Sequence, residues 1–148
     1  MKSAMPETRG SVIPFPNAAP VNDTQGIWVE VCSLDDLTPA SGVAALVGGR
    51  QIAVVRVGDG DEVYAVGNFD PFSRAFVIAR GIVGDRAGVP KIASPIFKQS
   101  FDLRTGQCLD DPSVRLPSFP VSVRHGRIAI FVAPEHVNQH DNEEKTNA

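Results

Sequence analysis

Two cysteines and three histidines are the residues of this 148-residue chain that could bind a metal ion or carry out redox chemistry. Cys32 and Cys108 lie far apart in the sequence, and His125 stands alone. His136 and His140 have a spacing that can place two imidazoles on one helical face, but no cysteine or third ligand accompanies them. We therefore interpret the histidines as surface residues and the cysteines as free, half-buried thiols.

Two further side chains could act as a general base and a nucleophile, and each precedes a proline. Asp70 stands before Pro71, where an aspartate more often accepts a hydrogen bond from the backbone two residues later. Ser94 stands before Pro95 and has no histidine and aspartate at a spacing that identifies a triad. Both patterns favour hydrogen bonding within loops over catalysis.

The composition excludes several classes of protein. Apolar residues make up 43% and charged residues 21%, with a net charge of −3, which is typical of a soluble domain and unsuited to binding nucleic acid. No stretch approaches the roughly 18 apolar residues of a membrane span. The first ten residues lead into no apolar segment typical of a signal peptide. We expect a cytoplasmic protein with neither a membrane nor a nucleic-acid partner.

Short β-branched segments punctuated by glycine predict one all-β domain over residues 26–133. The predicted strands are IWVEVC, VAALVG, QIAVVRV, EVYAVG, VSVRHG and RIAIFV. Turns are expected at Gly58-Asp59-Gly60-Asp61 and at His125-Gly126, where residues that tolerate positive φ join two strands. Residues 1–25 are proline-rich and predict a flexible arm, and the polar residues 134–148 predict a disordered tail.

Two segments between these strands resemble the cluster-binding loops of Rieske ferredoxins in order and spacing. They are NFDPFSRAFVIARGIVGD (residues 68–85) and VPKIASPIFKQSFDLRTGQCLDD (residues 89–111). Rieske loops read Cys-x-His and Cys-x-x-His, and the second continues into an F-D-L-x-T-G-like ending, which residues 101–106 reproduce. The resemblance implies a Rieske-like antiparallel β-sandwich or small barrel, with the two loops at one site.

The four ligand positions of these loops carry other residue types. Asp70 and Phe72 stand at the Cys and His positions of the first loop, and Ser94 and Phe97 at those of the second. A Rieske cluster needs two thiolates on one iron and two imidazoles on the other, and a phenyl ring offers no lone pair. We expect no bound cluster or other metal, and we expect the two phenyl rings to fill the former site by apolar packing.

The motifs D-P-F-S, A-R-G-I-V-G-D and A-S-P-I-F-K-Q resemble the small subunits of assimilatory NAD(P)H nitrite reductases, over about residues 28–132. This resemblance implies a non-catalytic subunit that supports assembly or electron transfer. Its partner would be a large subunit that carries FAD, siroheme and a [4Fe–4S] cluster and reduces nitrite to ammonium.

Basic and polar residues of the two loops are candidates for the interface with that partner, although solvated loop charge is an equally simple interpretation. The candidates are Arg74, Arg80, Arg86, Lys98 and Gln99. The alternative function is an independent cluster-free Rieske-like protein that binds a small ligand or uses Cys32 or Cys108 in thiol redox chemistry.

Overall fold

The computed structural model describes residues 26–133 of the chain. The predicted arm and tail, residues 1–25 and 134–148, lie outside these described residues. Within residues 26–133 the chain forms antiparallel strands and two single-turn 3-10 helices, and no helix there is long and apolar enough to cross a membrane. The elements are β1 (Ile27–Ser33), η1 (Leu34–Asp36), β2 (Ser41–Val47), β3 (Arg50–Arg56), β4 (Val63–Gly67), β5 (Phe69–Asp70), β6 (Ala75–Phe76), η2 (Ile78–Arg80), β7 (Ile82–Arg86), β8 (Val89–Ala93), β9 (Ser100–Asp102), β10 (Ser118–Phe119), β11 (Val121–Arg124) and β12 (Arg127–Val132).

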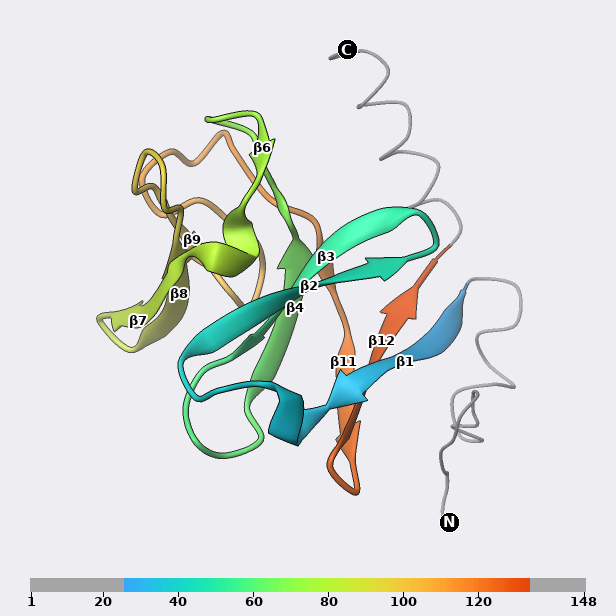
Figure 1. Cartoon of the computed structure of the whole chain (residues 1–148). Helices are drawn as coiled ribbons and strands as arrows, with labels where there is room; N and C mark the ends of the chain where they lie inside the picture. Colours follow the sequence, from blue (N-terminus) through green and yellow to red (C-terminus); the bar gives the residue numbers. More distant parts are fainter. Residues whose placement is uncertain (1–25, 134–148) are drawn as a thin grey trace.

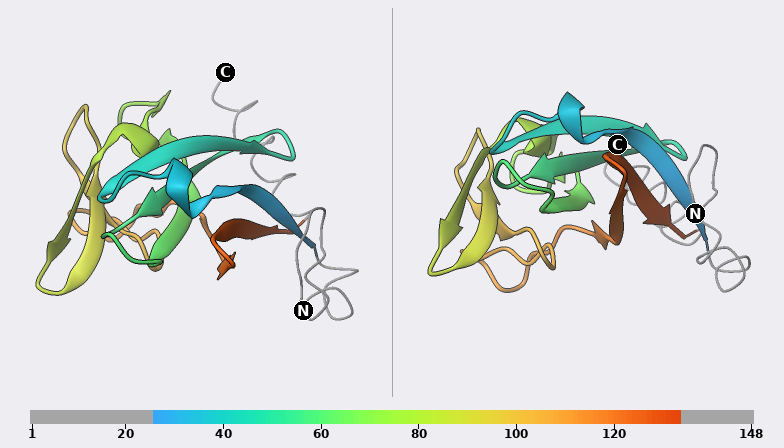
Figure 2. Two further views of the ribbon diagram at one scale, coloured as in Figure 1. Left: turned by 60° about the horizontal axis from the view of Figure 1, so that its bottom comes forward. Right: turned by 90° about the horizontal axis from the view of Figure 1, so that it is seen from below.

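The strands form antiparallel sheets, which confirms the predicted all-β Rieske-like class. Within residues 26–133 these sheets are open and do not close into a barrel. The strand orders are β1-β12-β11, β10-β4-β3-β2, β5-β6 and β7-β8-β9. Figures 1 and 2 show the β7-β8-β9 sheet and the β1-β12-β11 sheet at opposite ends of the molecule, with β2, β3 and β4 between them. The central sheet therefore lies between two other sheets, one at each end of the molecule.

Strand β3 is buried on both faces, which is why its sequence RQIAVVR shows no polar alternation. Its Ile52 and Val54 belong to a core shared with the β1-β12-β11 sheet, whereas Ala53 and Val55 belong to a second core. The second core also contains Ile92 and Phe101 of the β7-β8-β9 sheet together with Ile78 of η2. The two Rieske-like loops adjoin this second core, because Phe72 of the first loop packs against it and Ile92 and Phe101 flank the second loop.

The two predicted hairpins are confirmed. Strands β3 and β4 pair in antiparallel register, and the Arg56 guanidinium braces the turn between them by donating to the Gly60 and Asp59 carbonyl oxygens at 2.9 and 2.8 Å. Strands β11 and β12 pair through a turn in which His125 and Gly126 both have positive φ, at 52° and 75°. Such a turn matches the twist of the flanking strands.

Candidate functional site

The first Rieske-like loop is a tight turn between β5 and β6. The backbone N–H of Phe72 donates to Asp70 Oδ1 at 3.0 Å, which confirms the predicted Asx turn. The backbone N–H of Arg74 donates to the Asp70 carbonyl oxygen at 2.7 Å and closes the turn. Arg74 itself has a φ of 61°, in the left-handed region that side chains rarely adopt.

The second loop, between β8 and β9, repeats this arrangement. The backbone N–H of Ile96 donates to Ser94 Oγ at 3.2 Å, and that of Lys98 donates to the Ser94 carbonyl oxygen at 3.1 Å. Lys98 has a φ of 70°. Each loop thus starts with an oxygen-bearing side chain before a proline and has a cation in left-handed backbone at its fifth residue. We call the segments 70–74 and 94–98 the paired turns.

A direct hydrogen bond joins the first residues of the paired turns. Ser94 Oγ donates to Asp70 Oδ2 at 2.6 Å, and Ser73 Oγ donates to the same oxygen at 2.8 Å. Asp70 and Ser94 are both fully buried. The sequence interpretation missed this contact, although a signal was available, because the two cysteines of a Rieske cluster bind the same iron and their replacements should therefore lie close together.

Two further residues position the first Rieske-like segment; the sequence interpretation assigned no role to Asn68 and treated Gly81 only as a turn glycine. Asn68 is buried; its side chain donates to Gln51 Oε1 at 3.0 Å and its Oδ1 accepts from the Ala79 N–H at 2.7 Å. Gly81 passes so close to Ala93 that a Cβ at Gly81 would lie 2.3 Å from the Ala93 carbonyl oxygen. This close approach brings the chain at Gly81 against the residue before Ser94.

The two phenylalanines differ in their surroundings. Phe72 is half-buried and packs against Phe101 of the second core, with ring centroids 6.2 Å apart. Phe97 is 57% exposed, and its neighbour Ile96 is 45% exposed. The prediction that both rings fill the former site is therefore wrong for Phe97. The reason is the turn closed by Lys98, which places the residues inside it at the tip of the loop.

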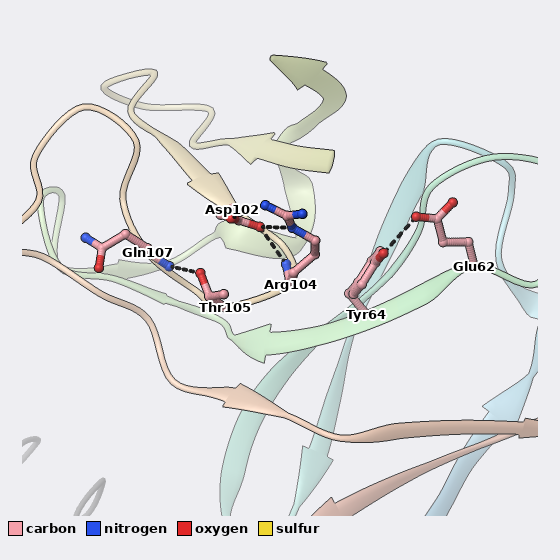
Figure 3. A network of polar contacts seen from close by, with 6 residues as sticks. All are labelled: Glu62, Tyr64, Asp102, Arg104, Thr105 and Gln107. Atoms are coloured by element: carbon pink, nitrogen blue, oxygen red, sulfur yellow. Dashed lines mark hydrogen bonds and ion pairs between the residues drawn. The ribbon is translucent and has the colours of Figure 1, made fainter. Parts of the chain in front are cut away.

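The base of the second loop is fixed by its F-D-L-R-T-G motif (Figure 3). Asp102 Oδ1 accepts from the backbone N–H of Arg104 at 2.9 Å, and the Arg104 guanidinium lies 3.1 Å from Asp102 Oδ2. Burial acts to raise the pKa of Asp102, but the hydrogen bonds and charge of Arg104 outweigh it and lower that pKa below its ordinary value. Gly106 has a φ of +86°, and a Cβ there would lie 2.0 Å from the Leu116 carbonyl oxygen.

The predicted interface residues do not all lie together. Arg74 and Lys98 are exposed on the paired turns, and Arg80 is exposed at the end of η2, which follows β6. Arg86 pairs with Val89 at the tip of the β7-β8 hairpin, whereas Ala93, next to Ser94, pairs with Ile82 at the other end. Four residue steps along the strand separate these pairs, a distance of about 13 Å.

Arg86 and Gln99 also have structural contacts of their own. The Arg86 guanidinium forms an ion pair with Asp110 at 3.3 Å. Gln99 is half-buried, and its backbone oxygen accepts from the Ser94 N–H at 2.8 Å. Gln99 Oε1 is enclosed and has no hydrogen-bond donor among residues 26–133. Gln99 therefore closes the second loop through its backbone hydrogen bond with Ser94, while its side-chain oxygen stays enclosed.

Comparison with known proteins identifies the family. Residues 27–131 match the Rieske-like [2Fe-2S] domain. The chain is 37% identical over 103 residues to the nitrite reductase (NADH) small subunit of Salmonella typhimurium, covering 70% of this chain and 95% of that protein. The chain belongs to the Rieske-like family of nitrite reductase small subunits.

A solved structure and a longer relative extend the comparison of this small-subunit homologue. A crystal structure from Mycobacterium tuberculosis, assigned by its name to NADH-dependent nitrite reductase small subunits, has 49% identity and a TM-score of 0.69, covering 72% of this chain and 96% of that one. The nitrite reductase [NAD(P)H] large subunit of Klebsiella oxytoca is 40% identical over 101 residues, which are 68% of this chain but 10% of that protein.

The residues that this small-subunit homologue offers at the expected ligand positions do not fit a [2Fe–2S] cluster. Two of the four are phenyl rings, which cannot coordinate iron. The other two are the Ser94 hydroxyl and the Asp70 carboxylate, which are joined by a hydrogen bond of 2.6 Å. Among residues 26–133 no group of three His, Cys, Asp or Glu side chains is arranged to hold a metal ion.

Both thiols of this small-subunit homologue are free, as predicted. Cys108 is buried rather than half-buried, with 2% of its surface exposed. Cys32 is half-buried, and this burial raises the pKa of its thiol, with a further contribution from the negative charge of Asp36. A raised pKa lowers the fraction of thiolate, which is the reactive form. The surroundings of Cys32 therefore do not favour reaction, and burial keeps Cys108 away from solvent reagents.

Proposed function

We propose that this chain is the small subunit of a cytoplasmic NAD(P)H-dependent nitrite reductase and binds the large subunit that reduces nitrite to ammonium. FAD, siroheme and a [4Fe–4S] cluster belong to the large subunit in this proposal. The small subunit contributes no catalytic residue and supports assembly or electron transfer through its surface.

The Klebsiella oxytoca relative is the observation that carries this proposal. There, a stretch homologous to this chain is part of a single polypeptide named as the large subunit. Covalent linkage raises the effective concentration of two domains and favours their association. A domain that occurs both linked to the large subunit and as a separate chain is expected to have a docking surface for it. The residues at the four expected ligand positions do not fit a cluster, and this supports a role in binding rather than in carrying electrons on a cluster of its own.

The paired turns are the surface that we propose for docking. The tip of the second turn exposes Ile96 and Phe97, and large apolar side chains exposed side by side mark interaction sites more often than isolated ones do. The cations Arg74 and Lys98 end the same turns, and Arg80 follows the first of them. An apolar centre with a charged rim is typical of protein interfaces. We expect an apolar patch with acidic neighbours on the large subunit.

Arg86 and Gln99 complete the predicted set but have weaker support as docking residues. Arg86 lies at the far end of the β7-β8 hairpin and is paired with Asp110, and the Gln99 carbonyl oxygens face inward. We propose that Gln99 acts by shaping the second turn. An effect of Arg86 on binding would extend the docking surface along the hairpin.

Reconstitution with the purified large subunit tests the proposal. We expect the full chain to bind the large subunit and to have no nitrite-dependent NAD(P)H oxidation alone. The double variant Arg74→Glu, Lys98→Glu should weaken binding at least tenfold at low salt, and less at high salt, because rim charges act mainly by screened electrostatics. Arg115→Glu, an exposed charge change outside the paired turns, is the matched control.

Failure of the unmodified chain to bind the large subunit would contradict the proposed function. Equal weakening by Arg115→Glu would instead contradict docking by the paired turns.

A further inference from the structure

The paired turns are joined at one buried carboxylate. Asp70 accepts hydrogen bonds from the first turn, through the Phe72 N–H and the Ser73 hydroxyl, and from the second turn, through the Ser94 hydroxyl. Ser94 Oγ in turn accepts from the Ile96 N–H. A continuous chain of hydrogen bonds therefore runs from the tip of one turn to the tip of the other.

We propose that Asp70 and Ser94 cross-link the two loops in the way that a cluster would through its iron, and so hold the docking surface in one arrangement. This inference rests on the proposed function for its purpose, but the cross-link itself is a property of the isolated chain. Asp70 and Ser94 are positioning residues, because both are fully buried and cannot touch a partner.

The chemistry of the site suits a cross-link. A hydrogen bond to a carboxylate is stronger than one between neutral groups, and enclosure away from water strengthens it further. An enclosed carboxylate also needs its donors, since a buried charge without partners is costly. Two of the donors come from the first turn and one from the second, so Asp70 is satisfied only while the turns stay together.

The backbone of the paired turns gives a reason for the cross-link. Arg74 and Lys98 both hold left-handed φ values, which persist only where the surrounding structure enforces them. Each is held by a hydrogen bond to the first residue of its own turn, at the Asp70 and Ser94 carbonyl oxygens. Fixing these first residues to each other fixes both cations relative to one another.

Amide hydrogen exchange on two single variants of the full chain tests the cross-link. Ser94→Ala removes the bond between the turns, whereas Ser73→Ala removes a bond to the same Asp70 oxygen from within the first turn. We expect Ser94→Ala to raise exchange about tenfold in both turns and to leave strands β11 and β12 unchanged. Ser73→Ala should raise exchange in the first turn only. If Ser94→Ala does not fold, Asp70→Asn replaces it.

Faster exchange confined to the second turn in Ser94→Ala, or unchanged exchange in both, would overturn the cross-link.

Binding to the purified large subunit, measured well below the unfolding temperature, adds a readout that a purely structural bond would not change. We expect Ser94→Ala to raise the Kd about tenfold and Ser73→Ala to raise it less. Faster exchange in both turns with an unchanged Kd would leave the cross-link standing and contradict docking by the paired turns. The failure of each idea is therefore recognised separately.

Discussion

Ser94 Oγ donates a hydrogen bond to Asp70 Oδ2 at 2.6 Å, across 24 residues of sequence and between two fully buried side chains. The two residues begin turns of the same design, one after β5 and one after β8. By the resemblance to Rieske ferredoxins, this hydrogen bond joins the two positions at which thiolates would bind one iron. The structure of this region therefore depends on a carboxylate and its donors.

Loss of the Asp70 carboxylate should destabilise the fold. In Asp70→Ala the Ser73 and Ser94 hydroxyls and the Phe72 N–H lose their acceptor in a buried site. We expect the free energy of unfolding, measured by urea titration, to fall by about 2–4 kcal/mol. Asp61→Ala, at an exposed turn position, should change it by less than about 0.5 kcal/mol. Similar values for the two variants would show that the buried carboxylate is not structurally required.

Gly106 and Gly88 form a matched pair for separating steric exclusion from backbone strain. Both have a φ of +86°, but a Cβ at Gly106 would lie 2.0 Å from the Leu116 carbonyl oxygen, whereas one at Gly88 would meet nothing within 4 Å. We expect Gly88→Ala to cost about 1 kcal/mol from strain alone. Gly106→Ala should cost at least about 3 kcal/mol in thermal or urea unfolding. Equal costs would mean that the loop at Leu116 moves away freely.

Acid should weaken the base of the second loop through Asp102. Its pKa is lower in the folded state than in the unfolded state, so its contribution to stability is complete above the ordinary value of about 3.9 and is lost as pH falls through the folded-state pKa. We expect Asp102→Asn to be less stable than the unmodified chain at pH 7, with the difference shrinking as the pH falls through the folded-state pKa of Asp102. Unfolding curves across this range measure it. A difference for Asp102→Asn that stays constant as the pH falls would contradict the assignment.

Reconstitution with iron and sulfide tests the donor set directly. The unmodified chain should acquire no Rieske-type absorbance, because phenyl, hydroxyl and carboxylate groups stand at the expected ligand positions. The quadruple variant Asp70→Cys, Phe72→His, Ser94→Cys, Phe97→His should acquire it. The double variant Asp70→Cys, Ser94→Cys supplies ligands for one iron and is the control. Stoichiometric iron and sulfide in the unmodified chain would show that it can hold a cluster despite these substitutions.

Local patterns in the sequence predicted much of the fold. The predicted strand segments form β1, β2, β3, β4, β11 and β12, and the predicted turns join β3 to β4 and β11 to β12. These elements depend on neighbouring residues. The Asx turn at Asp70 is local in the same sense. By contrast, the sequence does not predict β7 and β8, whose IVGDR and VPKIA include glycine, proline and charged residues. These strands form because they pair with each other and with β9.

The sequence by itself determined the all-β class, the family and the absence of cluster-binding chemistry at four positions, because residue type and short-range spacing decide these properties. Only the tertiary structure decided that Asp70 and Ser94 bond to each other, that Phe97 faces outward while Phe72 packs on Phe101, and that Arg86 lies away from Lys98. The first two facts depend on how distant segments pack on a shared core, and the third depends on the register of the β7-β8 hairpin. Neither packing nor register leaves a periodic signal in the chain.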